Sequence, residues 1–213
     1  MKKIYIIGAG GSGREVVEII KDLNIIELSY EICGFIDDNH DIWGTTINGI
    51  KVLGGVDFLI EESTKHECYA VISIADCDIK EDIARRLNRY VTWENIVHPT
   101  AKIWSFVDIG HGNIIEPFVF VGPNAQIGNH VLINTKANIG HDSIIEDYSS
   151  IMCLCDITGN VHIEKKVYVA SRVSVIPGLT VGKSAKLGAG AVIIKDVKPN
   201  VTMHGYMAVE ATK

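Results

Sequence analysis

Two histidines of this chain stand where an imidazole could take up a proton from a bound molecule. His111 and His141 each follow, by two positions, an aliphatic residue of one periodic pattern, Ile109 and Ile139. In that pattern, described below, this offset predicts a corner position whose side chain points out of the core. Histidine titrates near neutral pH, so an outward imidazole beside a cleft could act as a general base. The spacing alone does not choose between the two histidines.

A glycine-rich segment near the start of the chain could bind a phosphate. Residues 2–7 predict a buried strand, residues 8–13 read GAGGSG, and residues 16–23 show the apolar face of a helix. A glycine-rich turn between a strand and a helix presents backbone N–H groups to a phosphate at the helix N-terminus. The second predicted strand ends in Asp37 and Asp38, where an acidic side chain can contact a nucleoside. This half of the chain therefore predicts nucleotide binding.

The nucleotide-binding half is small. The pattern predicts a few further strands and helices, at residues 52–53, 55–62, 68–75, 78–90 and 96–97. Asp78 is the expected cap of the helix at 78–90, and 96–97 is expected to be the last strand of this half. These elements make up roughly half of a dinucleotide-binding fold. A mononucleotide or a nucleotide-linked sugar therefore fits this half better than NAD.

The second half is built on an aliphatic repeat of six residues. Its members are Ile103, Ile109, Ile115, Val121, Ile127, Ile133, Ile139, Ile145, Ile151, Ile157, Ile163, Val169, Val175, Val181, Leu187 and Ile193. Small or aliphatic residues stand two positions before most of them, and Asn113 is the clear exception. A period of six matches no α-helix, but it matches short strands with inward side chains separated by turns. Three such strands make one coil of a parallel β-helix, and stacked coils bury a continuous aliphatic column.

Composition and charge argue against several classes of protein. The chain has 213 residues, of which 47% are hydrophobic and 22% charged, and its formal net charge is -6. These values predict a globular protein with a sizeable core and argue against binding to nucleic acid or to a membrane surface. No apolar run reaches the length of a membrane span, so we expect no membrane insertion.

The cysteines predict a reduced protein without a metal. Their number is odd, at five, and their spacing does not match that of zinc ligands. The pair Cys153 and Cys155 is separated by one residue, and Cys155 falls on a small inward position of the repeat, so we expect it in the core. We therefore expect no metal and a cytoplasmic location.

These features together resemble a known family. A small Rossmann-like domain, residues 35–38 (FIDD), His98-Pro99 at the junction and residues 133–142 (INTKANIGHD) are similar to the hexapeptide-repeat sugar acyltransferases of the sialic acid O-acetyltransferase type. This family includes the nucleotide-4-amino-sugar N-acetyltransferases of bacillosamine and perosamine synthesis. The resemblance implies an α/β Rossmann-like nucleotide-sugar-binding domain at residues 1–97. It also implies an all-β left-handed parallel β-helix, the acyltransferase domain, at residues 98–213, including a C-terminal tail.

The resemblance also implies roles for individual residues. His141 would be the general base and Asp142 its orienting partner. The acyl donor would be acetyl-CoA, bound in a cleft between the subunits of a homotrimer, at Gly159, Ser171 and Ala189. The acceptor would be a nucleotide-activated amino sugar, bound by Gly10, Gly11, Ser12, Asp37, Asp38 and Asn134.

We therefore expect an acetyl-CoA-dependent N-acetyltransferase that acts on the 4-amino group of a nucleotide-linked 4-amino-4,6-dideoxy sugar by direct transfer, in polysaccharide biosynthesis. The same base would serve a hydroxyl, so O-acetylation of sialic acid or a related sugar stays open. Two alternatives come from other classes: an NAD-binding oxidoreductase or sensor, and a non-catalytic trimer. The last is suggested by Ser12 and Ser150, which stand where many relatives have histidine.

Overall fold

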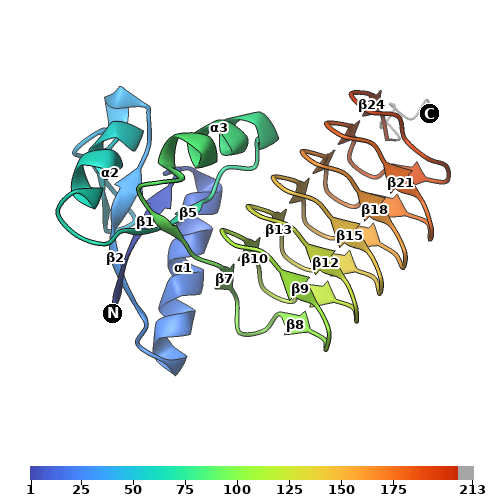
Figure 1. Cartoon of the computed structure of the whole chain (residues 1–213), viewed down its shortest axis with the longest axis horizontal. Helices are drawn as coiled ribbons and strands as arrows, with labels where there is room; N and C mark the ends of the chain where they lie inside the picture. Colours follow the sequence, from blue (N-terminus) through green and yellow to red (C-terminus); the bar gives the residue numbers. More distant parts are fainter. Residues whose placement is uncertain (206–213) are drawn as a thin grey trace, which may run out of the picture.

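In the computed structural model, which describes residues 1–205, an α/β domain lies beside a triangular prism of stacked coils (Figure 1). The sheet of the α/β domain has the strand order β3-β4-β2-β1-β5-β6. Its strands are β1 (Lys2–Ile7), β2 (Tyr30–Ile36), β3 (Thr46–Ile47), β4 (Ile50–Gly54), β5 (Tyr69–Ile72) and β6 (Thr92–Trp93). The helices are α1 (Gly11–Ile26), α2 (Val56–Ser63) and α3 (Cys77–Leu87), with a short 3-10 helix, η1, at His40–Ile42.

Helices cover both faces of this sheet. The central strand β1 is apolar at consecutive positions because its side chains are buried on both sides, as is usual in parallel sheets. Ile4 and Ile6 pack with α1, whereas Tyr5 and Ile7 pack with α2 and α3. β1 pairs in parallel with β2 and β5, so the carboxyl ends of these three strands meet at one edge. The glycine-rich segment follows β1 at that edge.

The prism has three faces, each a ladder of two-residue parallel strands. The first face contains β7 (Ile96–Val97), β10 (Ile114–Ile115), β13 (Leu132–Ile133), β16 (Ser150–Ile151), β19 (Tyr168–Val169), β22 (Lys186–Leu187) and β24 (Thr202–Met203). The second face contains β8 (Lys102–Ile103), β11 (Phe120–Val121), β14 (Asn138–Ile139), β17 (Asp156–Ile157), β20 (Ser174–Val175) and β23 (Val192–Ile193). The third face contains β9 (Asp108–Ile109), β12 (Gln126–Ile127), β15 (Ile144–Ile145), β18 (His162–Ile163) and β21 (Thr180–Val181).

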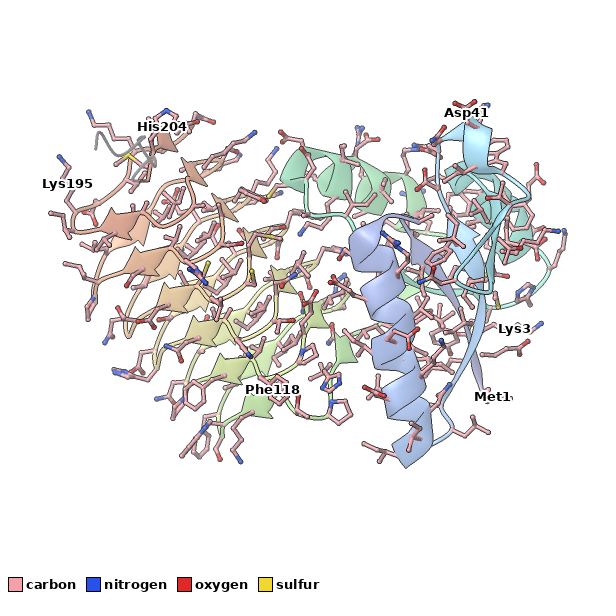
Figure 2. The ribbon with its side chains drawn as sticks, turned by 180° about the vertical axis from the view of Figure 1, so that it is seen from behind. Met1, Lys3, Asp41, Phe118, Lys195 and His204 are labelled. Carbon is pink, nitrogen blue, oxygen red and sulfur yellow. The ribbon has the colours of Figure 1, made fainter. Side chains whose placement is uncertain are left out.

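Successive faces meet at corners, which are named here in chain order. The first corner joins the first and second faces, the second corner joins the second and third, and the third corner leads back to the first face. Each strand except the last of its face pairs with the strand that lies one coil further along, as Asn138 pairs with Asp156, eighteen residues later. Figure 2 shows the stack from behind, with Phe118 near its first coils and His204 at its opposite end.

The aliphatic repeat fills the core of the prism as the sequence predicts. Ile139, Ile157 and Val175 are all fully buried in one column. Cys155 is also buried, as expected for its inward position. The predicted exception, Asn113, points inward too, and its side-chain amide is satisfied by Gly128 O at 3.0 Å and by the N–H of Val131 at 2.7 Å. The strand order and the buried column confirm the fold class expected from the sequence, a Rossmann-like domain followed by a parallel β-helix.

Two expectations about single elements were wrong. β7 (Ile96–Val97) pairs with β10, so it begins the first face of the prism, and the α/β sheet ends instead at β6. Helix α3 is capped by Asp76, whose Oδ1 accepts from the N–H groups of Asp78 and Ile79, both at 3.0 Å. The division of the chain at residues 97 and 98 stays a prediction.

The α/β domain is attached to the first face of the prism. Side chains of α1 share an apolar cluster with Ile114 and Leu132 of that face. Beside this cluster, the buried Lys80 of α3 donates from Nζ to Ser150 Oγ at 2.9 Å, and Ser150 Oγ donates to Ala75 O at 2.8 Å. Burial lowers the pKa of Lys80 to about 8. These contacts fix the glycine-rich edge of the sheet against the prism.

Within residues 1–205, none of the helices has the length and apolar character needed to cross a membrane.

The buried column predicts that replacing two different isoleucines changes the free energy of unfolding by very different amounts. Ile157→Ala removes a fully buried side chain and should lower the free energy of unfolding by about 2–5 kcal/mol. Ile194→Ala, at a position that is 69% exposed, should change it by less than about 0.5 kcal/mol. Urea denaturation of both variants at one protein concentration measures this difference. Equal losses in the two variants would contradict the assigned packing.

Candidate functional site

The second corner carries an exposed histidine and carboxylate in contact. His141 Nδ1 lies 2.7 Å from Asp142 Oδ2, and the side chains are 60% and 45% exposed. Asp142 occupies the left-handed region, with φ at 58°, which aspartate accepts more readily than most residues. The turn therefore places the carboxylate beside the imidazole that precedes it.

Asp142 determines which nitrogen of His141 is free. Hydrogen bonds from His141 and from Asn124 Nδ2, at 3.1 Å, lower the pKa of the Asp142 carboxyl below its usual range. A carboxylate can only accept, so the neutral imidazole carries its proton on Nδ1. Nε2 is then left as a proton acceptor, which is the arrangement that a general base requires.

The next coil leaves room for this imidazole. Gly159 lies eighteen residues after His141 at the same corner, and a Cβ at this position would come within 2.5 Å of His141 Nε2. Any side chain here would displace the ring. The predicted donor-binding residue Gly159 thus borders the free nitrogen of the predicted base, within one chain.

The first corner holds three other predicted residues. Asn134, Ser171 and Ala189 all lie there, and Asn134 is separated from His141 by strand β14. Ser171 Oγ accepts from the thiol of Cys153 at 3.2 Å, one coil below. Ala189 is exposed. These residues line an edge of the second face opposite the edge that carries His141.

The glycine-rich segment is shaped for a ligand. Gly13 packs so closely on Gly8 O that a Cβ could not fit, and Gly8 has φ at 101°, so both are restricted to glycine. At Gly10 an added Cβ would meet no atom within 4 Å, and at Gly11 only Arg14, at 3.9 Å. The N-terminus of α1 has no side-chain cap and opens onto this space, as the N-terminus of a phosphate-binding helix does.

The two aspartates differ in what they contact. Asp37 Oδ2 accepts from the N–H of Ala9 at 2.9 Å, so this carboxylate belongs to the glycine-rich site. Asp38 turns toward α2, where Oδ1 accepts from the N–H of Val56 at 2.8 Å and Oδ2 pairs with Arg86 at 3.0 Å. Asp37 Oδ1 also accepts from the N–H of Asn39 at 2.9 Å, so both oxygens of each aspartate are engaged within the chain.

Ser12 has a hydroxyl without a partner. Its Oγ is buried and forms no hydrogen bond with residues 1–205. Ser150 does have partners, since it accepts from Lys80 and donates to Ala75. The two serines that stand at family histidine positions thus have different surroundings.

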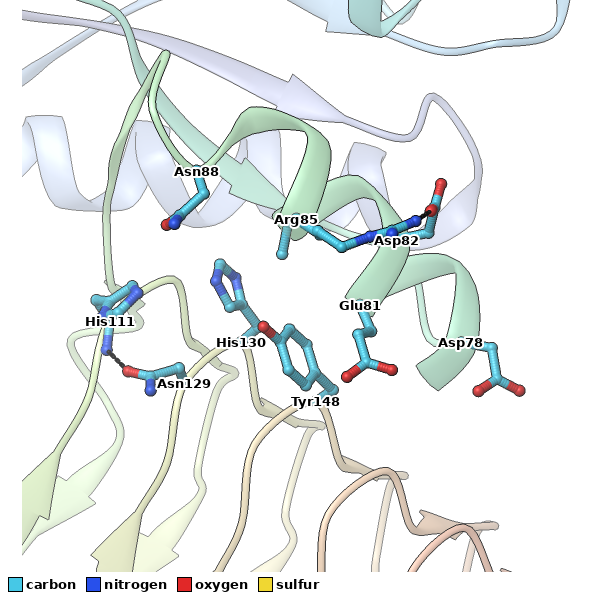
Figure 3. A pocket seen from close by; sticks show the side chains of 10 residues that line it. Asp78, Glu81, Asp82, Arg85, Asn88, His111, Asn129, His130 and Tyr148 are labelled. Carbon is cyan, nitrogen blue, oxygen red and sulfur yellow. Dashed lines mark hydrogen bonds and ion pairs between the residues drawn. The ribbon is translucent and has the colours of Figure 1, made fainter.

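The structure distinguishes the two histidines that the spacing left equivalent. His111 lies at the third corner and lines a groove of about 600 Å³ opposite α3 of its own chain (Figure 3). The neighbouring His130 is buried against Tyr148, with ring centroids 5.3 Å apart, and burial lowers its pKa to about 3. Only His141, of the two candidates, lies at a corner away from the α/β domain with an adjoining carboxylate.

Sequence reasoning missed Asn124 and Glu116. Asn124 supports Asp142, and Glu116 accepts from Asn134 Nδ2 at 3.0 Å. Each lies eighteen residues before its partner, so the length of one coil was the signal that could have found them. Among residues 1–205, no group of three or more His, Cys, Asp or Glu residues is arranged to hold a metal ion.

Comparison with known proteins gives three findings. The family model of the PglD N-terminal domain matches residues 3–87. The chain is 31% identical over 192 residues to the GDP-perosamine N-acetyltransferase of Escherichia coli O157:H7, covering 87% of this chain and 82% of that protein. It is 30% identical to the structure of WeeI from Acinetobacter baumannii AYE, with a TM-score of 0.86 and coverage of 96% and 97% of the two chains.

A further structure agrees in fold. PerB from Caulobacter crescentus, in complex with CoA and GDP-perosamine, is 23% identical, with a TM-score of 0.86 and coverage of 95% of this chain and 93% of that one. At this identity the likeness concerns the fold alone.

The contact between Gly159 and His141 predicts the effect of one added methyl group. Gly159→Ala should push the imidazole off its position and break the hydrogen bond from His141 Nδ1 to Asp142, because the new Cβ would overlap the ring. Nitrogen NMR of the histidine side chains, or a crystal structure of the variant, would detect this change. Gly11→Ala is the control, since its Cβ meets nothing closer than 3.9 Å. An unmoved ring in Gly159→Ala would refute the assigned contact.

Proposed function

The chain belongs to the hexapeptide-repeat nucleotide-amino-sugar acetyltransferases, and we propose that it transfers the acetyl group of acetyl-CoA to the 4-amino group of a nucleotide-linked 4-amino-4,6-dideoxy sugar. The observation that carries this proposal is the His141–Asp142 pair. In this pair, His141 Nδ1 is hydrogen-bonded to the carboxylate of Asp142, so His141 Nε2 is a free proton acceptor at an exposed corner. The relative in Escherichia coli is named for N-acetylation of GDP-perosamine, a reaction of this class.

The chemistry needs one base and one donor of hydrogen bonds. The lone pair of the sugar amine attacks the thioester carbonyl carbon, and His141 Nε2 takes the proton that the nitrogen loses. Negative charge on the carbonyl oxygen is stabilised by a fixed N–H group, for which the backbone of Gly159 is our candidate. The C–S bond then breaks, the proton reaches the departing thiolate, and free CoA leaves. Asp142 holds the imidazole in the required tautomer throughout.

Within a single protomer, the parts of this site lie at different places on the prism and the α/β domain. His141 lies at the second corner, Asn134 and Ser171 lie at the first, and the glycine-rich segment lies beyond the first face. We propose a homotrimer in which the second corner of one protomer lies beside the first corner of its neighbour. Acetyl-CoA would occupy the cleft between them, with its pantetheine arm along Ser171 and Ala189 of the neighbour.

The acceptor would span from the α/β domain to this cleft. Its diphosphate would bind at Gly10, Gly11 and Ser12, where the uncapped N-terminus of α1 is open. Asp37, whose carboxylate lies beside the glycine-rich segment, would contact the nucleoside, whereas Asp38, which contacts α2 and α3, would act through the position of α2. We propose that the enzyme works in the cytoplasm, where acetyl-CoA and nucleotide sugars are available, in polysaccharide biosynthesis.

Removal of the base tests the reaction. Thiol release from acetyl-CoA should occur with one of the UDP-, dTDP- or GDP-linked 4-amino-dideoxy sugars, and His141→Ala should lower kcat about 10²–10⁴-fold. His111→Ala, at the third corner, should stay within about twofold of wild type because a surface change away from the site has little effect. Turnover only on free sialic acid would move the protein to O-acetylation. Equal rates for wild type and His141→Ala would refute the assignment of the base.

Mixing two impaired variants tests the shared cleft. His141→Ala and Asn134→Ala protomers, unfolded and reassembled together at equal amounts, should regain about a quarter of wild-type activity. The reason is that about one interface in four then pairs an intact His141 with a neighbour's intact Asn134. Each variant refolded alone should stay well below that level. No recovery in a mixed assembly of confirmed trimers would mean that both residues serve one site from the same protomer.

A further inference from the structure

A buried carboxylate lies directly beneath Asn134 at the first corner. Glu116 is 1% exposed, and its Oε1 accepts from Asn134 Nδ2 at 3.0 Å. Its Oε2 accepts from the backbone N–H of Thr135 at 3.0 Å and from Thr135 Oγ1 at 2.8 Å. Burial raises the pKa of the Glu116 carboxyl, and no cation within residues 1–205 forms an ion pair with it. A buried charge held only by hydrogen bonds is costly, so its position calls for a specific role.

Glu116 determines which way the side-chain amide of Asn134 faces. An ionised carboxylate can only accept hydrogen bonds, so it must face the nitrogen of that amide. The N–H of Thr135 also donates to Asn134 Oδ1 at 2.8 Å, which agrees with the same orientation. Nδ2 carries two hydrogens, and Glu116 uses one of them. The second N–H of the half-buried Asn134 is therefore available to a ligand as a donor.

We propose that Glu116 is a positioning residue, which fixes the amide of Asn134 so that its second N–H donates to an oxygen of the acceptor sugar. This inference rests on the proposed function, because it places Asn134 in the cleft beside a neighbour's His141. Glu116 itself touches no substrate. Its effect reaches the acceptor through Asn134, and acetyl-CoA binding should depend on it much less.

Two substitutions, Glu116→Gln and Asn134→Asp, separate the effect of the orientation of the Asn134 amide from the effect of packing. In Glu116→Gln, the Gln amide can satisfy Thr135 with its oxygen, but its nitrogen faces the nitrogen of Asn134. In Asn134→Asp, two carboxylates face each other. In the double variant E116Q/N134D, the Gln nitrogen donates to one Asp oxygen, while the other Asp oxygen accepts from the N–H of Thr135. The double variant thus restores every internal hydrogen bond but leaves no N–H for the acceptor.

The test measures melting temperature and steady-state kinetics for these variants as intact trimers. Glu116→Gln should lower kcat/KM for the amino-sugar acceptor about tenfold or more, with KM for acetyl-CoA changed less than about threefold. The double variant should regain the melting temperature lost in the single variants, while its kcat/KM for the acceptor stays low. Glu164→Gln is the matched control, since Glu164 Oε2 accepts from the N–H of Lys183 at 2.6 Å at another corner. It should leave acceptor kinetics within about twofold of wild type.

Three outcomes would overturn this proposal while leaving the proposed function intact. One is recovery of both melting temperature and acceptor kinetics in E116Q/N134D, which would reduce Glu116 to a packing role. Another is failure of the double variant to regain stability, which would contradict the hydrogen bonds. The third is wild-type kinetics in Glu116→Gln. The proposed function is tested separately in the same assay, by turnover of wild type and its loss in His141→Ala, and silence of wild type on every acceptor would overturn both.

Discussion

The parallel hydrogen-bond ladder between coils is the constraint on which the rest of the structure depends. Backbone N–H groups of the strands donate to carbonyl groups of the neighbouring coil, as Asn138 N of β14 does to Cys155 O at 2.8 Å. A slip of one residue would turn the inward aliphatic side chains outward, so the register is fixed by burial. Residues eighteen apart therefore stand in vertical columns at each corner. The contacts of Asn124 with Asp142, of His141 with Gly159 and of Glu116 with Asn134 all follow from that register.

The same ladder explains how much of the molecule could be predicted. The six-residue spacing predicts the prism because the positions that are buried in the column recur at a fixed interval in the sequence. Cys155 occupies one of these inward positions and is buried. The glycine pattern predicts the loop before α1 because Gly8 and Gly13 meet where no Cβ fits. The cap of α3 could not be predicted from such a pattern. Asp76 and Asp78 are both acidic residues near the start of α3, and only the backbone geometry selects Asp76 as the cap.

One contact of the candidate site could be predicted because its two residues are adjacent in the chain. They are His141 and the carboxylate of Asp142, and the structure brings them into contact. The ion pair of Asp38 with Arg86 could not be predicted from the sequence, because it joins residues 48 apart through the packing of α2 and α3. Glu116 was also missed, since a single glutamate at a turn resembles any solvated residue until its burial is known. The separation of Asn134 from His141 at different corners follows from the triangular cross-section.

In the proposed reaction, the α/β domain recognises the nucleotide of the acceptor and the prism carries out the chemistry. Contacts of Lys80 and Ser150 hold the glycine-rich edge at a fixed place on the first face. A rigid distance between nucleotide and cleft would let binding energy from the nucleotide position the distant amine. The prism would supply the base and the acetyl donor at its corners.

In the proposed trimer, His141 of one protomer receives a proton from a sugar amine whose nucleotide is bound by a neighbour. A crystal structure of the His141→Asn variant with CoA and a nucleotide-linked 4-amino-dideoxy sugar tests it most directly. We expect a trimer in which the amine nitrogen lies within about 3.5 Å of the substituted side chain at position 141, with the diphosphate at the neighbour's glycine-rich segment. A sugar amine far from position 141, or a nucleotide bound away from Gly10 and Gly11, would show that this arrangement is wrong.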